Sequence, residues 1–202
     1  MSAMTTIVAD ISMSLDGFVT GPNAGPTNGL GDGGGPIHDW VFSDDAIDQA
    51  VLAEATERSG AVVMGRNLFD VIDGPQGWND EMGYGAQHAA RPSFFVVTHQ
   101  PPASVRLGLD FTFITEGVAA AIDAARVVCP SSKDVVVMGG GDVVRQAIDH
   151  RLIDELIIHL SPIVLGSGTP LFGQVARNQL RQTEVRISSF AVHVTYEPAS
   201  TD

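Results

Sequence analysis

The residues best suited to do chemistry in this 202-residue chain lie around three consecutive glycines at 139–141. A β-branched run precedes them and apolar residues at helical spacing follow, so the pattern predicts a strand over 134–138 and a helix over 142–150. The first backbone N–H groups of such a helix are unpaired and can bind a phosphate that bare glycines allow to approach. A strand–helix turn without a ligand is the alternative. The dinucleotide fingerprint is excluded because Val144 replaces its third glycine, and no Gly-Lys-Ser/Thr follows for a P-loop.

The other reactive side chains do not form a recognisable metal site. The six histidines are widely spaced, and none forms the i, i+4 pair of a helical zinc motif. Cys129 is the only cysteine, which excludes an intrachain disulfide and a cysteine-based metal cluster. A net charge of −13, with Lys133 as the only lysine, disfavours nucleic acids and anionic membranes as partners. A small anionic ligand needs only a local site.

The elements that must position the glycines alternate between strands and helices. We expect strands over 5–13, 61–64, 93–98, 111–115, 134–138, 154–160, 182–187 and 190–196, and helices over 44–58, 66–72, 117–128 and 142–150. Ser43 is the predicted N-cap of the first helix, whose apolar face should include Ile47 and Val51. This alternation indicates an α/β sheet, and the closing strand pair indicates an antiparallel edge.

Composition bounds the rest of the prediction. A hydrophobic fraction of 44% with 17% charged residues is typical of a globular chain, and we expect a single domain over residues 1–202. Segment 21–36 is rich in glycine and proline, and strands on both sides favour a functional lid over a linker. The sequence has neither a signal-peptide pattern nor an apolar run long enough to span a membrane, so we expect a soluble cytoplasmic protein.

Five short motifs occur together in one order. They are Ala9-Asp10 with Ser14-Leu15-Asp16-Gly17, Met64-Gly65-Arg66-Asn67-Leu68-Phe69, Val97-Thr98-His99, the triple glycine, and Pro162-Ile163-Val164-Leu165-Gly166-Ser167-Gly168. Together they resemble the dihydrofolate reductase-like superfamily, and more closely the branch that contains the reductase domain of riboflavin biosynthesis, over about residues 5–196. The resemblance implies a three-layer α/β fold: a mixed, mostly parallel sheet of about eight strands, helices on both faces, and NADPH bound across the strand ends.

The resemblance also implies a cofactor site. Gly65 and Arg66 would meet phosphates on the adenosine side, where a guanidinium matches phosphate geometry. Thr98 and His99 would contact the adenosine ribose or its 2′-phosphate. The complete implied set is Ala9, Val19, Gly65, Arg66, Asn67, Thr98, His99, Met138, Gly139, Gly140, Gly141, Asp142 and Val143. An exposed helix start is the alternative for Arg66, and a plain strand-ending turn is the alternative for Thr98 and His99.

Two members of this set need comment. Ala9 and Val19 would hold the nicotinamide carboxamide through their backbone groups, so their side chains do not test the assignment. Asp142 stands where folate-reducing relatives can carry a basic residue, and a carboxylate is poorly placed beside a phosphate. The resemblance implies NADPH as the cofactor, and because Asp142 removes one source of positive charge beside the phosphates, NADH is the alternative.

Reduction by a nicotinamide also requires a proton donor on the protein. Asp45 follows Trp40 at the spacing seen in folate-reducing relatives, Asp16 lies in the shared Ser-Leu-Asp-Gly turn, and His159 interrupts an apolar strand. His38 is a further candidate. Asp16, Trp40 and His159 are also the expected substrate contacts. Each has a structural alternative: a solvated helix start for Asp45, an ordinary turn for Asp16, and a buried core histidine for His159.

We therefore expect an NAD(P)H-dependent reductase that transfers hydride to a C=N or C=O bond of a pterin, a flavin precursor or a related heterocycle. The partner would be a small heteroaromatic substrate. A non-catalytic nucleotide- or small-ligand-binding protein that retains the fold is the alternative. The apolar segment 163–172 is compatible with a homodimer.

Overall fold

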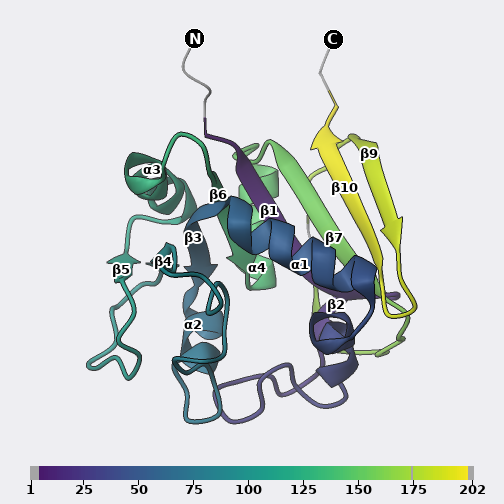
Figure 1. Cartoon of the computed structure of the whole chain (residues 1–202), viewed down its shortest axis with the longest axis horizontal. Helices are drawn as coiled ribbons and strands as arrows, with labels where there is room; N and C mark the ends of the chain where they lie inside the picture. Colours follow the sequence, from purple (N-terminus) through teal and green to yellow (C-terminus); the bar gives the residue numbers. More distant parts are fainter. Residues whose placement is uncertain (1–4, 174, 200–202) are drawn as a thin grey trace.

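A mixed eight-stranded sheet organises the chain in the computed structural model, which describes residues 5–173 and 175–199. Its strands are β1 (Ile7–Ser14), β3 (Ser59–Gly65), β4 (Ser93–Val97), β5 (Phe111–Ile114), β6 (Asp134–Gly139), β7 (Glu155–Ser161), β9 (Leu180–Ile187) and β10 (Val192–Pro198). Their order is β5-β4-β3-β6-β1-β7-β10-β9 (Figure 1). The six strands from β5 to β7 run parallel to one another, whereas β10 is antiparallel to both β7 and β9. The predicted fold class, including its antiparallel edge, is confirmed.

Helices cover both faces of this sheet. One face carries α3 (Val118–Val128) and α4 (Gly141–Asp149), whose apolar residues share a core with β1, β3 and β6. The other face carries the 3₁₀ helix η1 (Gly35–Phe42), α1 (Ala46–Arg58) and α2 (Arg66–Ile72). Figure 1 shows α1 running diagonally in front of β1 and β7, with α4 behind the sheet. These are the three predicted layers.

The strands under α1 and η1 carry polar side chains on the face that these helices cover. On β1 the apolar residues Ile7, Ala9 and Ile11 point toward the α3–α4 core, so Asp10 and Ser12 point the other way. Register places Ser12 beside His159 of β7, and His159 beside His193 of β10. Ser12, His159 and His193 are all buried. A row of buried polar groups on a sheet needs partners, and these partners build the site described below.

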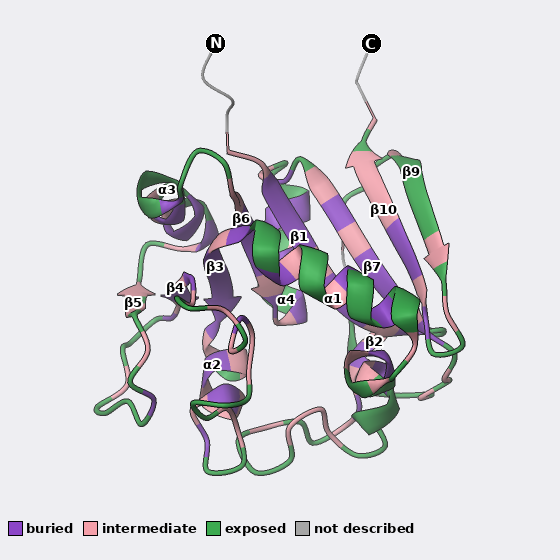
Figure 2. Cartoon of the chain, in the orientation of Figure 1, coloured by how far each residue is buried: buried purple, intermediate pink, exposed green. Residues whose placement is uncertain are grey.

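The first long helix departs from the prediction. The predicted N-cap Ser43 is wrong: Asp45 caps α1, and its Oδ1 accepts from the Ile47 N–H at 2.8 Å. The predicted apolar face is wrong for Ile47, which is 38% exposed, while Asp48, Val51 and Thr56 are the buried residues of α1. The reason lies in the polar sheet face beneath it, which a strictly apolar helix stripe could not satisfy. Figure 2 shows how much of α1 remains exposed.

Two regions are more ordered than the sequence indicates. Strand β2 (Phe18–Thr20) pairs with β8 (Thr169–Pro170) in a small antiparallel sheet, which the prediction missed because such short strands have no periodic pattern. The glycine-rich segment closes on itself, since the Gly21 N–H donates to Leu30 O at 2.8 Å and Asn23 and Asn28 side chains donate to Asp32. Helix η1 already begins at Gly35, inside the predicted loop.

No helix in the described part of the chain combines the length and the apolar character needed to cross a membrane.

Candidate active site

A cavity of about 1470 Å³ opens at the carboxyl ends of the parallel strands β3, β4 and β6 and extends beside β1 under η1 and α1. Pockets for a single small ligand are usually about 300–1,000 Å³, so this one has room for two ligands side by side. Carboxyl ends of strands are the usual ligand position in open α/β sheets. The cavity has two ends of different chemistry.

The first end is built by the turn between β6 and α4. Gly140, Gly141, Asp142 and Val143 line it, and Gly140 is the N-cap of α4 without a side-chain cap. A Cβ added at Gly140 would meet no protein atom within 4 Å, so the backbone there faces open space. Gly139 has φ +130°, a conformation that favours glycine. The unpaired N–H groups of the α4 first turn are therefore accessible to an anion, as the sequence predicts.

Arg66 and Thr98 bring a second polar group to the same end. The Arg66 Nε donates to Asp70 Oδ1 at 2.7 Å, and its Nη1 donates to the Gln100 carbonyl at 2.6 Å. Thr98 Oγ1 donates to the same carbonyl at 2.8 Å. Arg66, Thr98 and His99 all line the cavity. These bonds fix the guanidinium beside the end of β4, where it can add a planar set of donors to the helix terminus.

The structure brings together most of the predicted cofactor residues. Val19, Gly65, Asn67 and Met138 line the cavity together with those described above. Ala9 and Gly139 are not among its lining residues, and Ala9 is fully buried in the α3–α4 core. Because Ala9 was assigned through its backbone only, its role stays a prediction.

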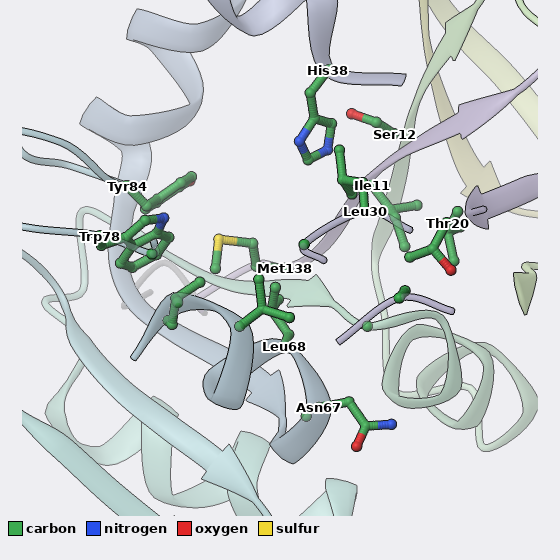
Figure 3. Close-up of a pocket in the computed structure, with 18 of the residues that line it drawn as sticks. Ile11, Ser12, Thr20, Leu30, His38, Asn67, Leu68, Trp78, Tyr84 and Met138 are labelled. Carbon is green, nitrogen blue, oxygen red and sulfur yellow. The ribbon is translucent and has the colours of Figure 1, made fainter. Parts of the chain in front are cut away.

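The second end of the cavity is aromatic and titratable. Asp10, Ser12, His38 and Trp40 line it. Figure 3 shows the His38 ring directed into the cavity beside Ser12. Trp78 and Tyr84 lie on the opposite wall, and Met138 lies between that wall and the His38 side. The Trp40 Nε1–H donates to Ser12 Oγ at 3.0 Å, which holds the indole in place. Burial, and next the charge of His159, lower the pKa of His38 to about 4, so His38 is neutral near pH 7.

Charge differs between the two ends. Among the described residues that line the cavity, Arg66 is the only arginine or lysine, and it lies at the first end. The second end carries Asp10, and Glu81 is a further carboxylate of the lining. Asp142 lies at the first end, where it forms an ion pair with Arg145. Anionic groups therefore find favourable contacts at the α4–Arg66 end and unfavourable ones near Asp10.

Behind the second end, four side chains form a continuous buried chain of hydrogen bonds. His159 Nε2 lies 2.9 Å from Asp10 Oδ1, and His159 Nδ1 lies 2.7 Å from His193 Nδ1. His193 Nε2 in turn lies 2.8 Å from Asp48 Oδ1. The Ser43 hydroxyl donates to Asp48 Oδ2 at 2.6 Å. Trp40 packs on His159 with ring centroids 4.1 Å apart, which seals the chain from the cavity except at Asp10.

None of the predicted proton donors Asp45, Asp16 and His159 lines the cavity directly. Asp45 caps α1 and does not line the cavity. Asp16 also lies outside the lining: its carboxylate accepts from the Gly166 N–H at 2.7 Å and the Ser14 hydroxyl at 2.7 Å. Desolvation opposes its ionisation, but these hydrogen bonds outweigh it and hold the pKa of Asp16 below its ordinary value. His159 is buried and reaches the cavity only through Asp10.

The sequence-based predictions do not identify three of the four side chains in this buried row of hydrogen bonds: Asp10, His193 and Asp48. Asp10 belongs to the Ala9-Asp10 motif, and the sequence signal that indicates its role is period-2 polarity. Asp10, Ser12 and Ser14 alternate with apolar residues on a strand that must be covered on both faces, as do His159 and Ser161 on β7. No group of three His, Cys, Asp or Glu side chains is placed to hold a metal ion in residues 5–173 and 175–199.

Comparisons with known proteins agree with this architecture. The family model described as the RibD C-terminal domain matches residues 129–196. The uncharacterized protein YyaP of Bacillus subtilis (strain 168) is 23% identical over 198 residues, which covers 94% of this chain and 93% of YyaP.

Two solved structures show the same fold over nearly the whole chain. A putative riboflavin biosynthesis protein from Shewanella sp. PV-4 superposes with a TM-score of 0.70 at 20% identity, covering 97% of this chain and 100% of that one. A dihydrofolate reductase from Enterococcus faecalis, complexed with NADP(H), gives a TM-score of 0.59 at 14% identity and covers 98% of both chains. The chain thus has the dihydrofolate reductase-like fold, with its C-terminal third matching the RibD C-terminal domain, and the predicted resemblance to this superfamily and its riboflavin-type branch is confirmed.

Proposed function

We propose that this protein is an NAD(P)H-dependent reductase that transfers hydride to a C=N or C=O bond of a small pterin, flavin precursor or related heterocycle. The observation that carries the proposal is the convergence of the bare α4 N-terminus, the fixed Arg66 guanidinium and the Thr98–His99 strand end on one cavity. These groups match the phosphates and ribose of a dinucleotide. The same cavity continues into an aromatic end that suits a flat ring.

The residues present fit such a cofactor. Gly140 leaves space in front of the α4 N–H groups for a pyrophosphate, and Arg66 with Thr98 and His99 would hold the adenosine-side phosphate and ribose. A bound nicotinamide would supply the hydride. The names of similar proteins support this: one fold relative is a dihydrofolate reductase complexed with NADP(H), and another is a putative riboflavin biosynthesis protein.

The charges of the cavity narrow the substrate class. Folate carries carboxylates beyond its ring, and such groups need a cation near the substrate end. The substrate end carries the carboxylate Asp10. Arg66 is the one arginine or lysine among the described lining residues, and it lies at the opposite end. We therefore propose an uncharged heterocycle, held between Trp40, Trp78 and Tyr84, with Asp10 and the neutral His38 available for hydrogen bonds.

A matched pair of substrates tests this proposal. We expect the protein to oxidise NADPH with 7,8-dihydrobiopterin, a neutral pterin, and to have a kcat/KM at least about tenfold lower with dihydrofolate, a difference of roughly 1.4 kcal/mol. The measurement is the loss of nicotinamide absorbance in steady state. A preference for dihydrofolate would contradict the charge argument, and no oxidation with any C=N heterocycle of a wider panel would contradict the reductase proposal.

We also propose a homodimer. Large apolar side chains are exposed on the edge strand β9 (Val185, Ile187) and on the excursion before it (Val164, Phe172). An exposed apolar edge strand is unfavourable unless another surface covers it. Light scattering should give twice the chain mass, and Ile187→Glu should shift it to the single mass; a monomeric wild type would refute this proposal.

A further inference from the structure

We propose that Asp10 is the proton donor of the reaction and that His159, His193 and Asp48 form a buried relay that keeps it supplied with a proton. This inference rests on the proposed reductase function for the chemistry, but the relay itself is a property of the protein without ligands. It assigns the donor to β1 instead of the start of α1 or the turn after β1.

The geometry of the relay is linear. Four side chains from four elements (β1, β7, β10 and α1) meet through three contacts of 2.9, 2.7 and 2.8 Å. Asp48, His159 and His193 are almost completely buried, with 0%, 1% and 4% of their surface exposed. The Asp10 side chain is 15% exposed and lines the cavity. A proton can therefore leave or enter this chain at the Asp10 end.

Counting the protons of the three contacts shows that the relay holds an additional proton. Each of the three contacts joins two heteroatoms, and each needs one proton between them to be attractive. Two neutral imidazoles bring only two N–H groups. Without a further proton, two acceptor atoms would face each other at less than 3 Å in a buried site, which is strongly unfavourable. The four side chains therefore hold one proton more than two carboxylates and two neutral imidazoles.

The surroundings place this extra proton near the cavity. Burial first, and the charge of His159 as well, lower the pKa of His193 despite the opposing effect of Asp48. The pKa of Asp48 is also lowered, because hydrogen bonds from Ser43, Ser188 and His193 outweigh its desolvation. Because the Asp48 and His193 end disfavours it, the extra proton lies in the contact between His159 Nε2 and Asp10 Oδ1, bonded to the nitrogen in the ligand-free protein.

Other titratable groups also face Asp10, from the elements packed against β1. From η1, the neutral His38 is close enough to interact electrostatically with both Asp10 and His159. From the segment after α2, Tyr84 is near enough to interact with Asp10: burial first, and the Asp10 charge next, raise the pKa of its phenol. Neither His38 nor Tyr84 carries a charge near pH 7, so neither supplies a positive charge beside Asp10.

The proposed step balances as follows. Reduction of a C=N bond adds a hydride at carbon, and the π electron pair becomes a lone pair on nitrogen. The third proton of the relay first passes from His159 Nε2 to Asp10 Oδ1, and the nitrogen lone pair takes it from the Asp10 carboxyl group. Asp10 is then a carboxylate and His159 Nε2 carries no proton, while one proton remains between the two Nδ1 atoms and one between His193 Nε2 and Asp48. Water returns a proton through Asp10 to His159 Nε2 when the product leaves, so each turnover consumes one hydride and one proton.

The first test counts protons in the ligand-free protein. Proton–nitrogen correlation NMR of ¹⁵N-histidine protein at pH 7 should show three ring N–H groups for His159 and His193 together, one of them strongly deshielded and shared between the two Nδ1 atoms. Asp48→Asn keeps the hydrogen bonds but removes a charge, so it should lower the pH at which the third N–H group is lost. Only two ring N–H groups in the wild type would overturn the relay.

The second test addresses Asp10 as the donor. Asp10→Asn should reduce the single-turnover rate with 7,8-dihydrobiopterin by about 100-fold or more, and leave the Kd of NADPH unchanged. Asp48→Asn should shift the fall of the rate to lower pH, which a purely structural role would not do. Asp44→Asn, an exposed carboxylate beside the start of α1, is the matched control and should behave as the wild type. A wild-type rate for Asp10→Asn, or an unshifted pH profile for Asp48→Asn, would overturn the donor assignment.

The two tests separate this inference from the proposed function. A protein that shows three N–H groups but does not reduce any probe has the relay without the reductase activity, which contradicts the donor role. A protein that reduces 7,8-dihydrobiopterin at the wild-type rate after Asp10→Asn is a reductase with another donor.

Discussion

At the scale of single residues, His38 shows how the cavity controls protonation. Its ring lies beside Ser12 and points into the cavity, across from Trp78 and Tyr84 (Figure 3). Burial and the nearby His159 keep it neutral, with a pKa of about 4 instead of 6.5. A neutral imidazole can both donate and accept a hydrogen bond, which suits a heterocycle with ring nitrogens. The same environment makes folding dependent on pH.

Acid should destabilise the protein in a window set by His38. Between its folded value of about 4 and its unfolded value of 6.5, the unfolded chain binds a proton that the folded chain refuses. The stability from neutral His38 is therefore complete above pH 6.5 and is lost as the pH falls to about 4. Urea unfolding should show that His38→Gln loses about 2 kcal/mol less stability than the wild type between pH 7 and pH 5. His150→Gln, at an exposed position, is the control, and an equal loss in all three proteins would refute this account.

The buried chain illustrates what the sequence could and could not reveal at this scale. His159 stands out in the sequence because it interrupts an apolar strand. Its partners Asp10, His193 and Asp48 do not, because Asp10 lies 149 positions away and His193 lies 34 positions away. No local spacing encodes a contact that forms only when β1, β7 and β10 lie side by side. Asp45, by contrast, had the right local spacing and serves as a helix cap.

At the scale of elements, the turn from β6 into α4 is the feature that the sequence described best. The β-branched strand, the glycines and the amphipathic helix each have a local signal, and all three lie where the sequence predicts them. Helix α1 was predicted less well, because its buried face is defined by the polar groups beneath it and not by its own periodicity. Asp142 lies in the first turn of α4, is exposed and forms an ion pair with Arg145. Changing it therefore tests whether an anion binds at the α4 terminus.

Removing the Asp142 charge should strengthen cofactor binding. A carboxylate in the first turn of α4 stabilises the helix but repels a phosphate bound at the same terminus. We expect Asp142→Asn to lower the Kd of NADPH by about threefold at low salt, because an exposed charge interacts with energies below about 1 kcal/mol, and the effect should shrink at high salt. Asp123→Asn on α3, which is also exposed and does not line the cavity, should leave the Kd unchanged. If both variants bind like the wild type, the phosphates do not lie at α4.

At the scale of the whole molecule, different strands of the sheet carry different groups of the site. Carboxyl ends of the parallel strands β3, β4 and β6 hold the anion-binding groups, while β1, β7 and the antiparallel β10 hold the buried relay. Strand order places the anion-binding groups and Asp10, the exposed end of the relay, in one cavity. A net charge of −13 would repel a dinucleotide, and the local arrangement of Arg66 and the α4 terminus opposes this repulsion. The proposed function therefore requires this end of the cavity to bind a reduced pyridine nucleotide.

Titration of the purified protein with NADPH, followed by nicotinamide fluorescence, tests that claim most directly. We expect saturable binding of one NADPH per chain with a Kd in the micromolar range or below, and Arg66→Gln should raise the Kd about tenfold or more by removing a charged phosphate partner. Arg126→Gln, an exposed arginine on α3, should leave the Kd unchanged. A parallel titration with NADH ranks the two cofactors. No saturable binding of either nucleotide would contradict the account.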